Sequence, residues 1–231
     1  MMASANSIPD YGPVFAKLRD GAGETWEAYT HHAFVEGLRD GTLPREAFLH
    51  YLRQDYVFLM HFSRAWALAI VKARRFEEMT AAAATVNGLL AEEVKLHVGV
   101  CAEAGISKED LFATVEREEN MAYTRYVMDA GFSGDFPTLL AALAPCVLGY
   151  GEIGARLTQE KTSKTYSDWI ATYGGHDYQT SCATVGALLE DALVYRYGEN
   201  YDTLPVWEHL SDTFLAATRL EVGFWQMGLT P

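Results

Sequence analysis

The chain has 231 residues, of which 49% are hydrophobic, 13% aromatic and 21% charged. This composition excludes a disordered chain and predicts a sizeable buried core. The chain carries 18 lysines and arginines against 31 aspartates and glutamates, so its formal net charge is −13 at pH 7. Because such a charge repels phosphate backbones and anionic lipids, we expect neither nucleic acid nor a membrane as a partner.

Cysteine usage and the apolar segments point to a soluble, cytoplasmic protein. Cys101, Cys146 and Cys182 are widely spaced and form no CxxC pair, which fits a reducing compartment. The residues before Lys17 lack the basic region and the long apolar stretch of a secretory signal. The longest uncharged stretch, 136–151, is shorter than the roughly 20 apolar residues that a membrane helix needs.

Apolar residues recur at three- and four-residue spacing along most of the chain, which predicts an all-α protein. We expect a single domain over residues 1–231, built as one bundle of seven to eight helices. Along the chain, the pattern predicts a short helical pair around 12–31, a loop over 37–43 and helices at 44–72, 75–104, 108–130, 136–160, 163–173, 175–198 and 203–228. Pro145 predicts a kink in its helix.

One carboxylate lies within an apolar stripe of the helix predicted at 44–72. Asp55 is at helical spacing from Tyr51, Phe58 and Leu59. A buried aspartate must find hydrogen-bond donors or take a raised pKa. Pairing with an arginine, Arg53 or Arg64, or with another helix is the structural interpretation, and a role in a binding site is the functional one.

Two more reactive groups lie on apolar helix faces. Glu221 is surrounded along its helix by Phe214, Phe224 and Trp225, and a desolvated carboxyl can act as an acid near neutral pH. Cys146 follows Pro145 and lies one turn before Tyr150. A cysteine needs an activating neighbour to serve as a nucleophile, so the pattern alone favours packing for Cys146 and also for Cys101 and Cys182.

Tyrosines are numerous, with 13 in the chain, and several fall on apolar faces: Tyr51, Tyr123, Tyr150 and Tyr173. Aromatic rings with a few polar ends suit a planar heteroaromatic ligand, although tyrosines also fill bundle cores.

A metal site is the main competing enzymatic interpretation. Glu93 and His97 are four residues apart and could bind one ion from one helical face. Helical di-iron sites need a second matching set, and the sequence supplies no repeated Glu-x-x-His. We therefore expect a structural contact between Glu93 and His97 and no metal. No Walker-type loop, GxGxxG or GxSxG is present, which argues against nucleotide binding and serine hydrolysis.

Several segments together resemble the TenA family, the thiaminase II group of the haem-oxygenase-like helical fold. The matching stretches are HHAFVEGLRDGTLPREAFLHYLRQDYVFL, AEEVKLH, NMAYTRYV, APCVLGYGEIG, YSDWIATYGG and LEVGFWQM. The resemblance implies an aminopyrimidine hydrolase of thiamin salvage. Such an enzyme converts 4-amino-5-aminomethyl-2-methylpyrimidine to the hydroxymethylpyrimidine with release of ammonia, and it also cleaves thiamin between its two rings.

The resemblance also implies roles for individual residues. The family nucleophile falls on Cys146, and the catalytic acid falls on Glu221. Asp55 would accept a hydrogen bond from the exocyclic amine of the pyrimidine. The remaining substrate-binding residues would be Phe58, Tyr123, Tyr150, Tyr173 and Phe224. Some relatives have a tyrosine where this chain has Phe58, which bears on fine substrate preference.

The family reaction needs no cofactor, and its members usually form a homotetramer. Two alternatives from other classes remain open. One is an oxidase, metal-dependent or cofactor-free, on the same scaffold. The other is a protein that binds thiamin or its pyrimidine half without catalysis.

Overall fold

The computed structural model describes residues 9–231, apart from the side chains of residues 92 and 96. Within this range the chain is helical and contains no strand. The helices are α1 (Pro13–Thr30), α2 (Ala33–Asp40), α3 (Arg45–Lys72), α4 (Phe76–Gly88), α5 (Val94–Glu103), α6 (Lys108–Phe112), α7 (Glu118–Ser133), α8 (Phe136–Gln159), α9 (Ser167–Gly174), α10 (His176–Tyr197) and α11 (Pro205–Gly228), with a π-helical turn η1 (Leu89–Glu93) and a 3₁₀ turn η2 (Tyr201–Thr203). The expectation about a signal sequence falls largely on residues 1–8, outside this description.

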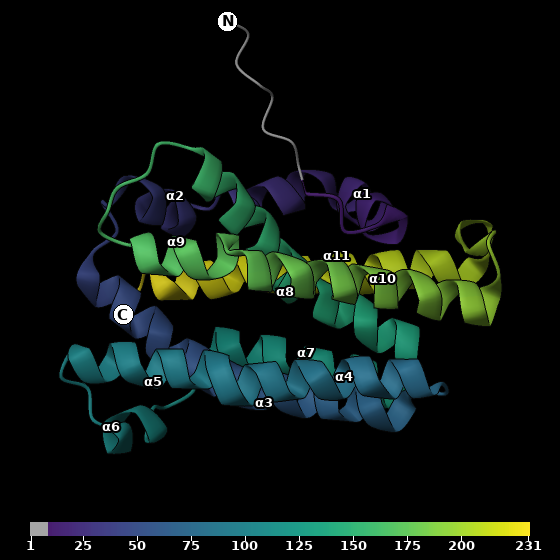
Figure 1. Ribbon diagram of the computed structural model, residues 1–231, viewed down its shortest axis with the longest axis horizontal. Helices are drawn as coiled ribbons and strands as arrows, with labels where there is room; N and C mark the ends of the chain where they lie inside the picture. Colours follow the sequence, from purple (N-terminus) through teal and green to yellow (C-terminus); the bar gives the residue numbers. More distant parts are fainter. Residues whose placement is uncertain (1–8) are drawn as a thin grey trace, which may run out of the picture.

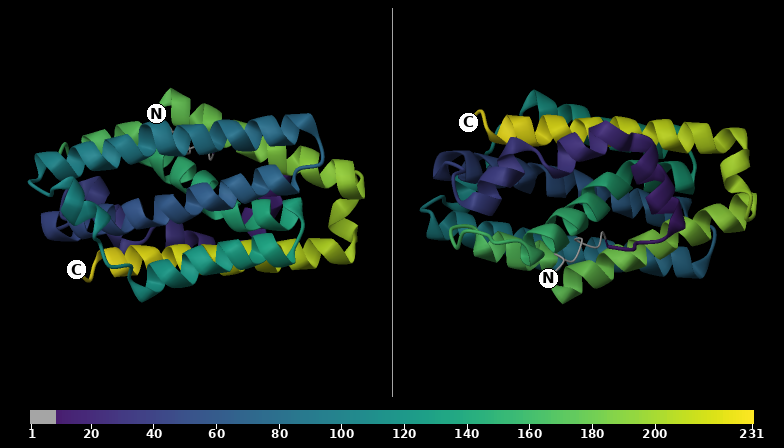
Figure 2. Two further views of the ribbon diagram at one scale, coloured as in Figure 1. Left: turned by 90° about the horizontal axis from the view of Figure 1, so that it is seen from below. Right: turned by 90° about the horizontal axis from the view of Figure 1, so that it is seen from above.

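The helices form two layers that α8 joins (Figure 1). Helices α3, α4, α5 and α7 make up the lower layer in that view, and α1, α2, α9, α10 and α11 make up the upper one. Seen from above and below, α8 runs obliquely between the long helices (Figure 2). It contacts α3 and α7 on one side and α1, α9, α10 and α11 on the other, so it lies at the centre of the fold.

The burial of α8 explains its composition. Of the helices in the described part of the chain, α8 alone is long and apolar enough to cross a membrane, and 83% of its most apolar window is buried inside the protein. A core helix surrounded by others is expected to be apolar all round. The helix continues through Pro145 without a break.

The all-α prediction is confirmed, but the predicted count of seven to eight helices is wrong, because eleven α-helices are present within residues 9–231. The predicted loop over 37–43 is helical up to Asp40. Gly37 continues α2 because Leu43 packs directly on it, and a Cβ at Gly37 would lie only 3.0 Å from the Leu43 Cβ. The turn follows at Gly41, whose φ of 80° suits glycine.

Two other predicted helices are divided. The helix predicted at 75–104 consists of α4 and α5, joined through η1. The helix predicted at 108–130 consists of α6 and α7, separated by residues 113–117. Within the predicted pair at 12–31, α1 is interrupted at Gly23, whose backbone leaves the helical region with φ of 46°. Glycine alone adopts such a conformation without strain.

Candidate active site

A cavity of about 630 Å³ lies where the two layers meet. Asp55, Phe58 and Phe62 of α3 line it from one layer, and Cys146 and Tyr150 of α8 line it from the centre. Its outer part passes between α4 and α10, where the lining includes Ala81, Ala84, Thr85, Gly88, His176, Thr180, Ser181 and Thr184. The inner part is therefore aromatic with a few acidic groups, and the outer part is more polar.

Asp55 is buried and pairs with another helix. Its Oδ2 lies 2.5 Å from Nε2 of His97 on α5, and the Tyr51 hydroxyl donates to the same oxygen at 3.5 Å. The Nδ1 atom of His97 donates to the backbone carbonyl of Glu93 at 2.9 Å, which fixes the imidazole. Burial of the imidazole lowers the pKa of His97, but the Asp55 carboxylate outweighs it and raises that pKa to about 9. The imidazole is therefore protonated at neutral pH.

Glu221 is 1% exposed, and the hydroxyl of Tyr123 on α7 donates to its Oε1 at 2.8 Å. Burial raises the pKa of Glu221 to about 8, although the hydrogen bond from Tyr123 lowers it and the charge of Asp55 raises it. Glu221 is consequently a carboxylic acid at neutral pH and can donate a proton.

Cys146 lies on the cavity wall one turn before Tyr150. Burial raises the pKa of its thiol well above the usual value, and the charges of Glu221, Glu93 and Asp55 raise it further. The thiol is therefore protonated in the empty cavity, and it can attack only if its proton is removed as the new bond forms.

Aromatic rings hold these polar groups in place. Phe58 lies 5.1 Å from Tyr123 and 5.3 Å from Phe224 between ring centroids. Tyr51 packs edge-on against Phe224 at 6.3 Å. These rings connect α3, α7 and α11 around the inner cavity. Of the four, Phe58 lines the cavity itself.

Tyr150 lines the cavity from α8, and Tyr173 lies behind it, with the two rings edge to face at 4.9 Å. Tyr173 comes from α9, which approaches α8 at Gly154. A Cβ on Gly154 would lie 2.3 Å from the carbonyl carbon of Tyr173, so only glycine permits this approach. The Tyr173 hydroxyl then donates to Oε1 of Glu93 at 3.1 Å.

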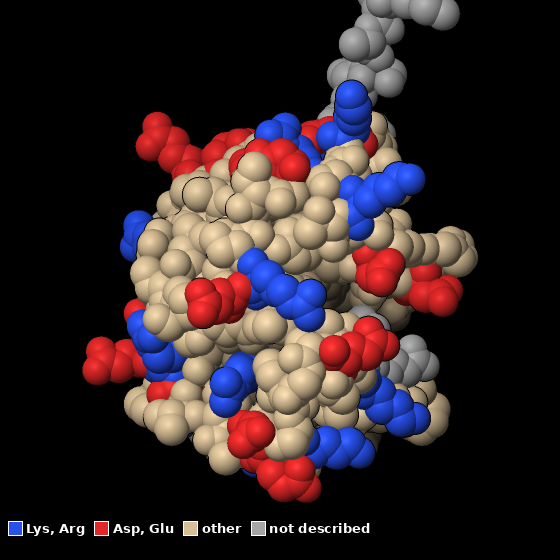
Figure 3. All heavy atoms as spheres, turned by 90° about the vertical axis from the view of Figure 1, so that its left-hand side faces the viewer, with Lys and Arg blue, Asp and Glu red and all other residues tan. Residues whose placement is uncertain are grey.

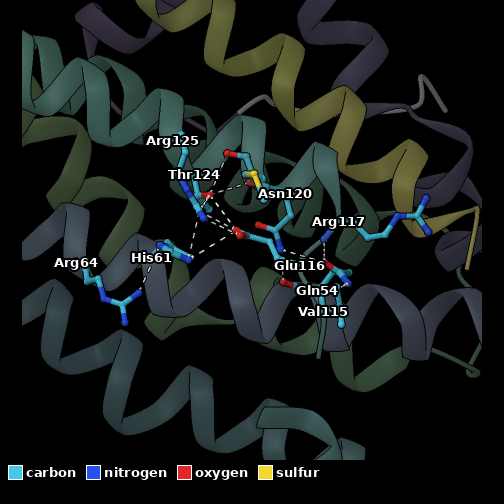
Figure 4. A network of polar contacts seen from close by, with 10 residues as sticks. Gln54, His61, Arg64, Val115, Glu116, Arg117, Asn120, Thr124 and Arg125 are labelled. Carbon is cyan, nitrogen blue, oxygen red and sulfur yellow. Dashed lines mark hydrogen bonds and ion pairs between the residues drawn. The ribbon is translucent and has the colours of Figure 1, made fainter. Parts of the chain in front are cut away.

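A polar network next to Asp55 fixes α3 relative to α7 (Figure 4). The Gln54 side chain donates to the carbonyl of Val115 at 2.9 Å and accepts from the backbone N–H of Arg117 at 3.0 Å. Asn120 donates to the Gln54 carbonyl at 2.7 Å. Because Asn120 lies about one helical turn before Tyr123, this network sets the position of Tyr123 relative to the helix that carries Asp55.

The same figure shows a second set of contacts, between Glu116 and α7. Arg125 binds Glu116 at 2.8 Å, and Thr124 donates to it at 3.2 Å. His61 of α3 lies 3.7 Å from the same carboxylate. These contacts are on the surface side of the α3–α7 contact and support the network around Gln54.

The structure brings the predicted site residues into one region. Four of them line the cavity, namely Asp55, Phe58, Cys146 and Tyr150. The other four, Tyr123, Tyr173, Glu221 and Phe224, lie behind this lining and contact it or its acids.

The structure decides between the structural interpretations of Asp55. It pairs with another helix through His97, whereas Arg53 reaches the carbonyl of Asp110 and Arg64 contacts His61. The predicted contact between Glu93 and His97 involves the backbone carbonyl of Glu93, because the carboxyl turns to Tyr173. Among the residues that the structure describes, no group of three histidine, cysteine or acidic residues could hold a metal ion.

Sequence analysis missed Gln54 and the part played by Tyr51. Gln54 is 3% exposed and directly precedes Asp55, so a second polar residue beside a buried acid was the available signal. Tyr51 lies one helical turn before Asp55 and also accepts from Nε1 of Trp169 at 3.3 Å.

Known proteins match most of the chain. The family model described as TENA/THI-4/PQQC matches residues 20–230. A crystal structure from Silicibacter sp. TM1040, described as a TenA family transcription regulator, superposes with a TM-score of 0.95 at 65% identity, covering 96% of this chain and 98% of the other.

Two curated relatives cover most of the chain. An uncharacterized protein of Haemophilus influenzae is 39% identical over 207 residues, which make up 88% of this chain and 93% of the relative. An aminopyrimidine aminohydrolase of Halalkalibacterium halodurans is 31% identical over 217 residues, 92% of this chain and 93% of the relative.

Proposed function

Because the chain belongs to the TENA/THI-4/PQQC family, we propose that it is an aminopyrimidine aminohydrolase of thiamin salvage. It is a hydrolase of carbon–nitrogen bonds. Its substrate is 4-amino-5-aminomethyl-2-methylpyrimidine, and it also cleaves thiamin into pyrimidine and thiazole parts. The observation that carries this proposal is the position of Cys146 on the wall of an aromatic cavity, close to two carboxyl groups of raised pKa, the buried Glu221 and the half-buried Glu93.

The aromatic lining suits the flat pyrimidine ring, with Phe58 on one wall and Tyr150 on the other. Asp55 binds the exocyclic amine. Its contacts with His97 and Tyr51 both use Oδ2, so Oδ1 is the oxygen that we assign to the substrate. The contact with His97 holds the Asp55 carboxyl in place as an acceptor. Phe58 has no hydroxyl to offer, so substrate preference rests on Asp55 and the tyrosines.

Cys146 adds to a ring carbon of the pyrimidine while Glu221 gives its proton to a ring nitrogen and takes up the proton of the thiol. This coupling removes the barrier set by the raised pKa of the thiol, because no free thiolate forms beside the acids. The leaving group then departs from the methylene carbon, water adds there, and the cysteine is released. The reaction uses only protein groups and water.

We further propose a cytoplasmic homotetramer made of single-domain chains. Large exposed apolar side chains on the surface suit such an assembly: Val71, Phe76, Phe112, Val115 and Phe132 are each at least 59% exposed. Light scattering of the purified protein tests the oligomeric state.

The Silicibacter protein is described as a transcription regulator, but DNA binding by the present chain finds no support in its charge distribution. The formal net charge is −13, and at the end of the molecule drawn in Figure 3 basic and acidic side chains are interspersed. Proteins that bind DNA present clustered lysine and arginine.

Ammonia release from the aminomethylpyrimidine tests the proposal. We expect Cys146→Ala to lower kcat by at least about a hundredfold. Cys101→Ala is the matched control, because Cys101 is buried in α5 and does not line the cavity. Mass spectrometry of the rapidly quenched wild type should reveal a covalent adduct on Cys146. An inactive wild type, or a Cys146→Ala variant that keeps its rate, would contradict covalent catalysis and favour the binder or the oxidase.

A further inference from the structure

The proposed reaction gives no task to Glu93, an acidic residue that lines the cavity near the nucleophile. Glu93 lies at the end of the π-helical turn η1, between α4 and α5, and it lines the cavity together with Cys146. A π turn inserted between α-helices is unusual and is often found at functional sites. Here it turns the Glu93 carboxyl toward the cavity and Tyr173, while its backbone carbonyl accepts from His97.

The surroundings of Glu93 set its pKa so that the acid and the carboxylate are both populated at neutral pH. Burial raises its pKa to about 7, the positive charge of His97 and the hydrogen bond from Tyr173 lower it, and the charge of Asp55 raises it. The titratable groups that interact with it across the cavity are Tyr51 and Asp55 of α3, His97 of α5, Cys146 of α8, Tyr173 of α9, and Tyr178 and Cys182 of α10. The pKa values of the histidine, the two cysteines and the three tyrosines in this set all lie above that of Glu93, so these groups hold their protons more tightly.

Glu93 and Glu221 come from different layers. Glu221 belongs to α11 and is held by Tyr123, whereas Glu93 belongs to the α4–α5 side and is held by Tyr173. Next to Glu93, the cavity opens into its outer part between α4 and α10, lined by Thr85, Thr180 and Ser181. This is the polar end of the cavity, through which a small amine can leave and water can enter.

On the basis of the proposed function, we propose that Glu93 is a second catalytic acid–base group, which serves the leaving amine. The substrate reacts as the neutral amine: as the bond between the methylene carbon and nitrogen breaks, the electron pair goes to nitrogen, and Glu93 donates the proton that makes the product neutral ammonia. Its carboxylate then accepts a proton from the water whose oxygen bonds to the methylene carbon. Glu93 thus ends the cycle protonated, and atoms and charges balance.

The leaving group provides the test. The amine needs a proton to depart as ammonia. The thiazolium group of thiamin departs as a neutral thiazole and needs none. Single-turnover release of the leaving group isolates this step from the later entry of water. We expect Glu93→Gln to slow single-turnover ammonia release by at least about a hundredfold and thiazole release by less than about tenfold.

Two further variants complete the experiment. Glu103→Gln removes an exposed carboxyl from the same helical run and should leave both rates unchanged. Glu93→Asp keeps a carboxyl one methylene shorter and should restore part of the ammonia release, which a purely structural role would not predict. Equal losses on both substrates, or no loss in Glu93→Gln, would overturn the inference. A wild type that releases neither product would instead overturn the proposed function.

Discussion

Two tyrosine–glutamate pairs flank the candidate nucleophile, and they differ in their surroundings. Tyr123 donates to Glu221 at 2.8 Å, and Tyr173 donates to Glu93 at 3.1 Å. Burial raises the pKa of both carboxyls, to about 8 for Glu221 and to about 7 for Glu93. The difference follows from His97, whose positive charge lowers the pKa of Glu93 and which does not act in this way on Glu221.

The comparison shows how one cavity can hold two acids for two tasks. A strongly raised pKa keeps Glu221 protonated until the substrate ring takes up its proton. A pKa near 7 lets Glu93 both give and accept a proton within one cycle, which a leaving amine followed by water requires. Buried carboxyls in different environments commonly divide acid and base roles in this way.

Substitution of Glu221 should have the largest effect on catalysis. Glu221→Gln removes the proton that the proposed mechanism delivers to the pyrimidine ring, a step that both substrates share. We therefore expect kcat to fall by roughly a hundred- to a thousandfold for the aminomethylpyrimidine and for thiamin alike. Steady-state rates on both substrates check this. A loss confined to one substrate would show that Glu221 and Glu93 do not divide the work as proposed.

Breaking the pair between Asp55 and His97, which lies on the Glu93 side, should cause the largest loss of stability. His97→Gln leaves the Asp55 carboxylate buried, at 4% exposure, without its cation. Removing one member of a buried pair costs about 3 kcal/mol or more. Urea unfolding at pH 7 measures the loss. Asp55→Asn combined with His97→Gln should recover part of it, and a double variant as unstable as the sum of the two single ones would argue against the pairing.

The fold could be predicted from the sequence more completely than the site. Asp55 and Glu221 stand out in the sequence because they interrupt apolar stripes whose period is that of an α-helix. The same period misleads at Glu93. Regular spacing predicts contact between the side chains of Glu93 and His97, whereas the Glu93 carboxyl accepts from Tyr173 and its backbone carbonyl accepts from His97.

Helical periodicity also does not predict contacts between segments that are far apart in the sequence. The Asp55–His97 pair and the Tyr173–Glu93 pair join residues 42 and 80 positions apart in the chain, respectively. Only the packing of α9 on α8 at Gly154 places Tyr173 within reach of Glu93. The helix count was too low for a similar reason, because η1 and the short α6 depend on tertiary contacts that apolar spacing does not reveal.

Stability as a function of pH sharpens the comparison of the two acids. A carboxyl whose folded pKa is raised contributes stability below its unfolded pKa of about 4.5, and this contribution is lost as pH rises through the folded pKa. Both glutamates therefore weaken the wild type with rising pH, up to about 7 for Glu93 and about 8 for Glu221. Glutamine does not titrate. Each variant should gain stability relative to the wild type as pH rises.

At pH 9 the expected gain in the free energy of unfolding is on the order of 5 kcal/mol for Glu221→Gln and on the order of 3 kcal/mol for Glu93→Gln, at about 1.4 kcal/mol per pKa unit. Both gains should vanish near pH 4. Urea unfolding at pH 4, 7 and 9 measures them, with Glu103→Gln as the exposed control. If the wild type and both variants keep a constant difference across this range, the two carboxyls do not have raised pKa values.

The smallest effects should come from the two tyrosine hydroxyls. Each hydroxyl lowers the pKa of the carboxyl to which it donates, so Tyr123→Phe and Tyr173→Phe should raise the pKa of Glu221 and Glu93, respectively. An acid loses activity as pH rises through its pKa, so the alkaline limb of the pH profile should move upward. One hydrogen bond is worth about 1 kcal/mol, which sets the shift below about one pH unit.

Tyr123→Phe should move the alkaline limb of the pH profile for both substrates, because Glu221 serves both. Tyr173→Phe should move it for ammonia release and leave thiazole release in place, because in the proposed mechanism only the amine takes its proton from Glu93.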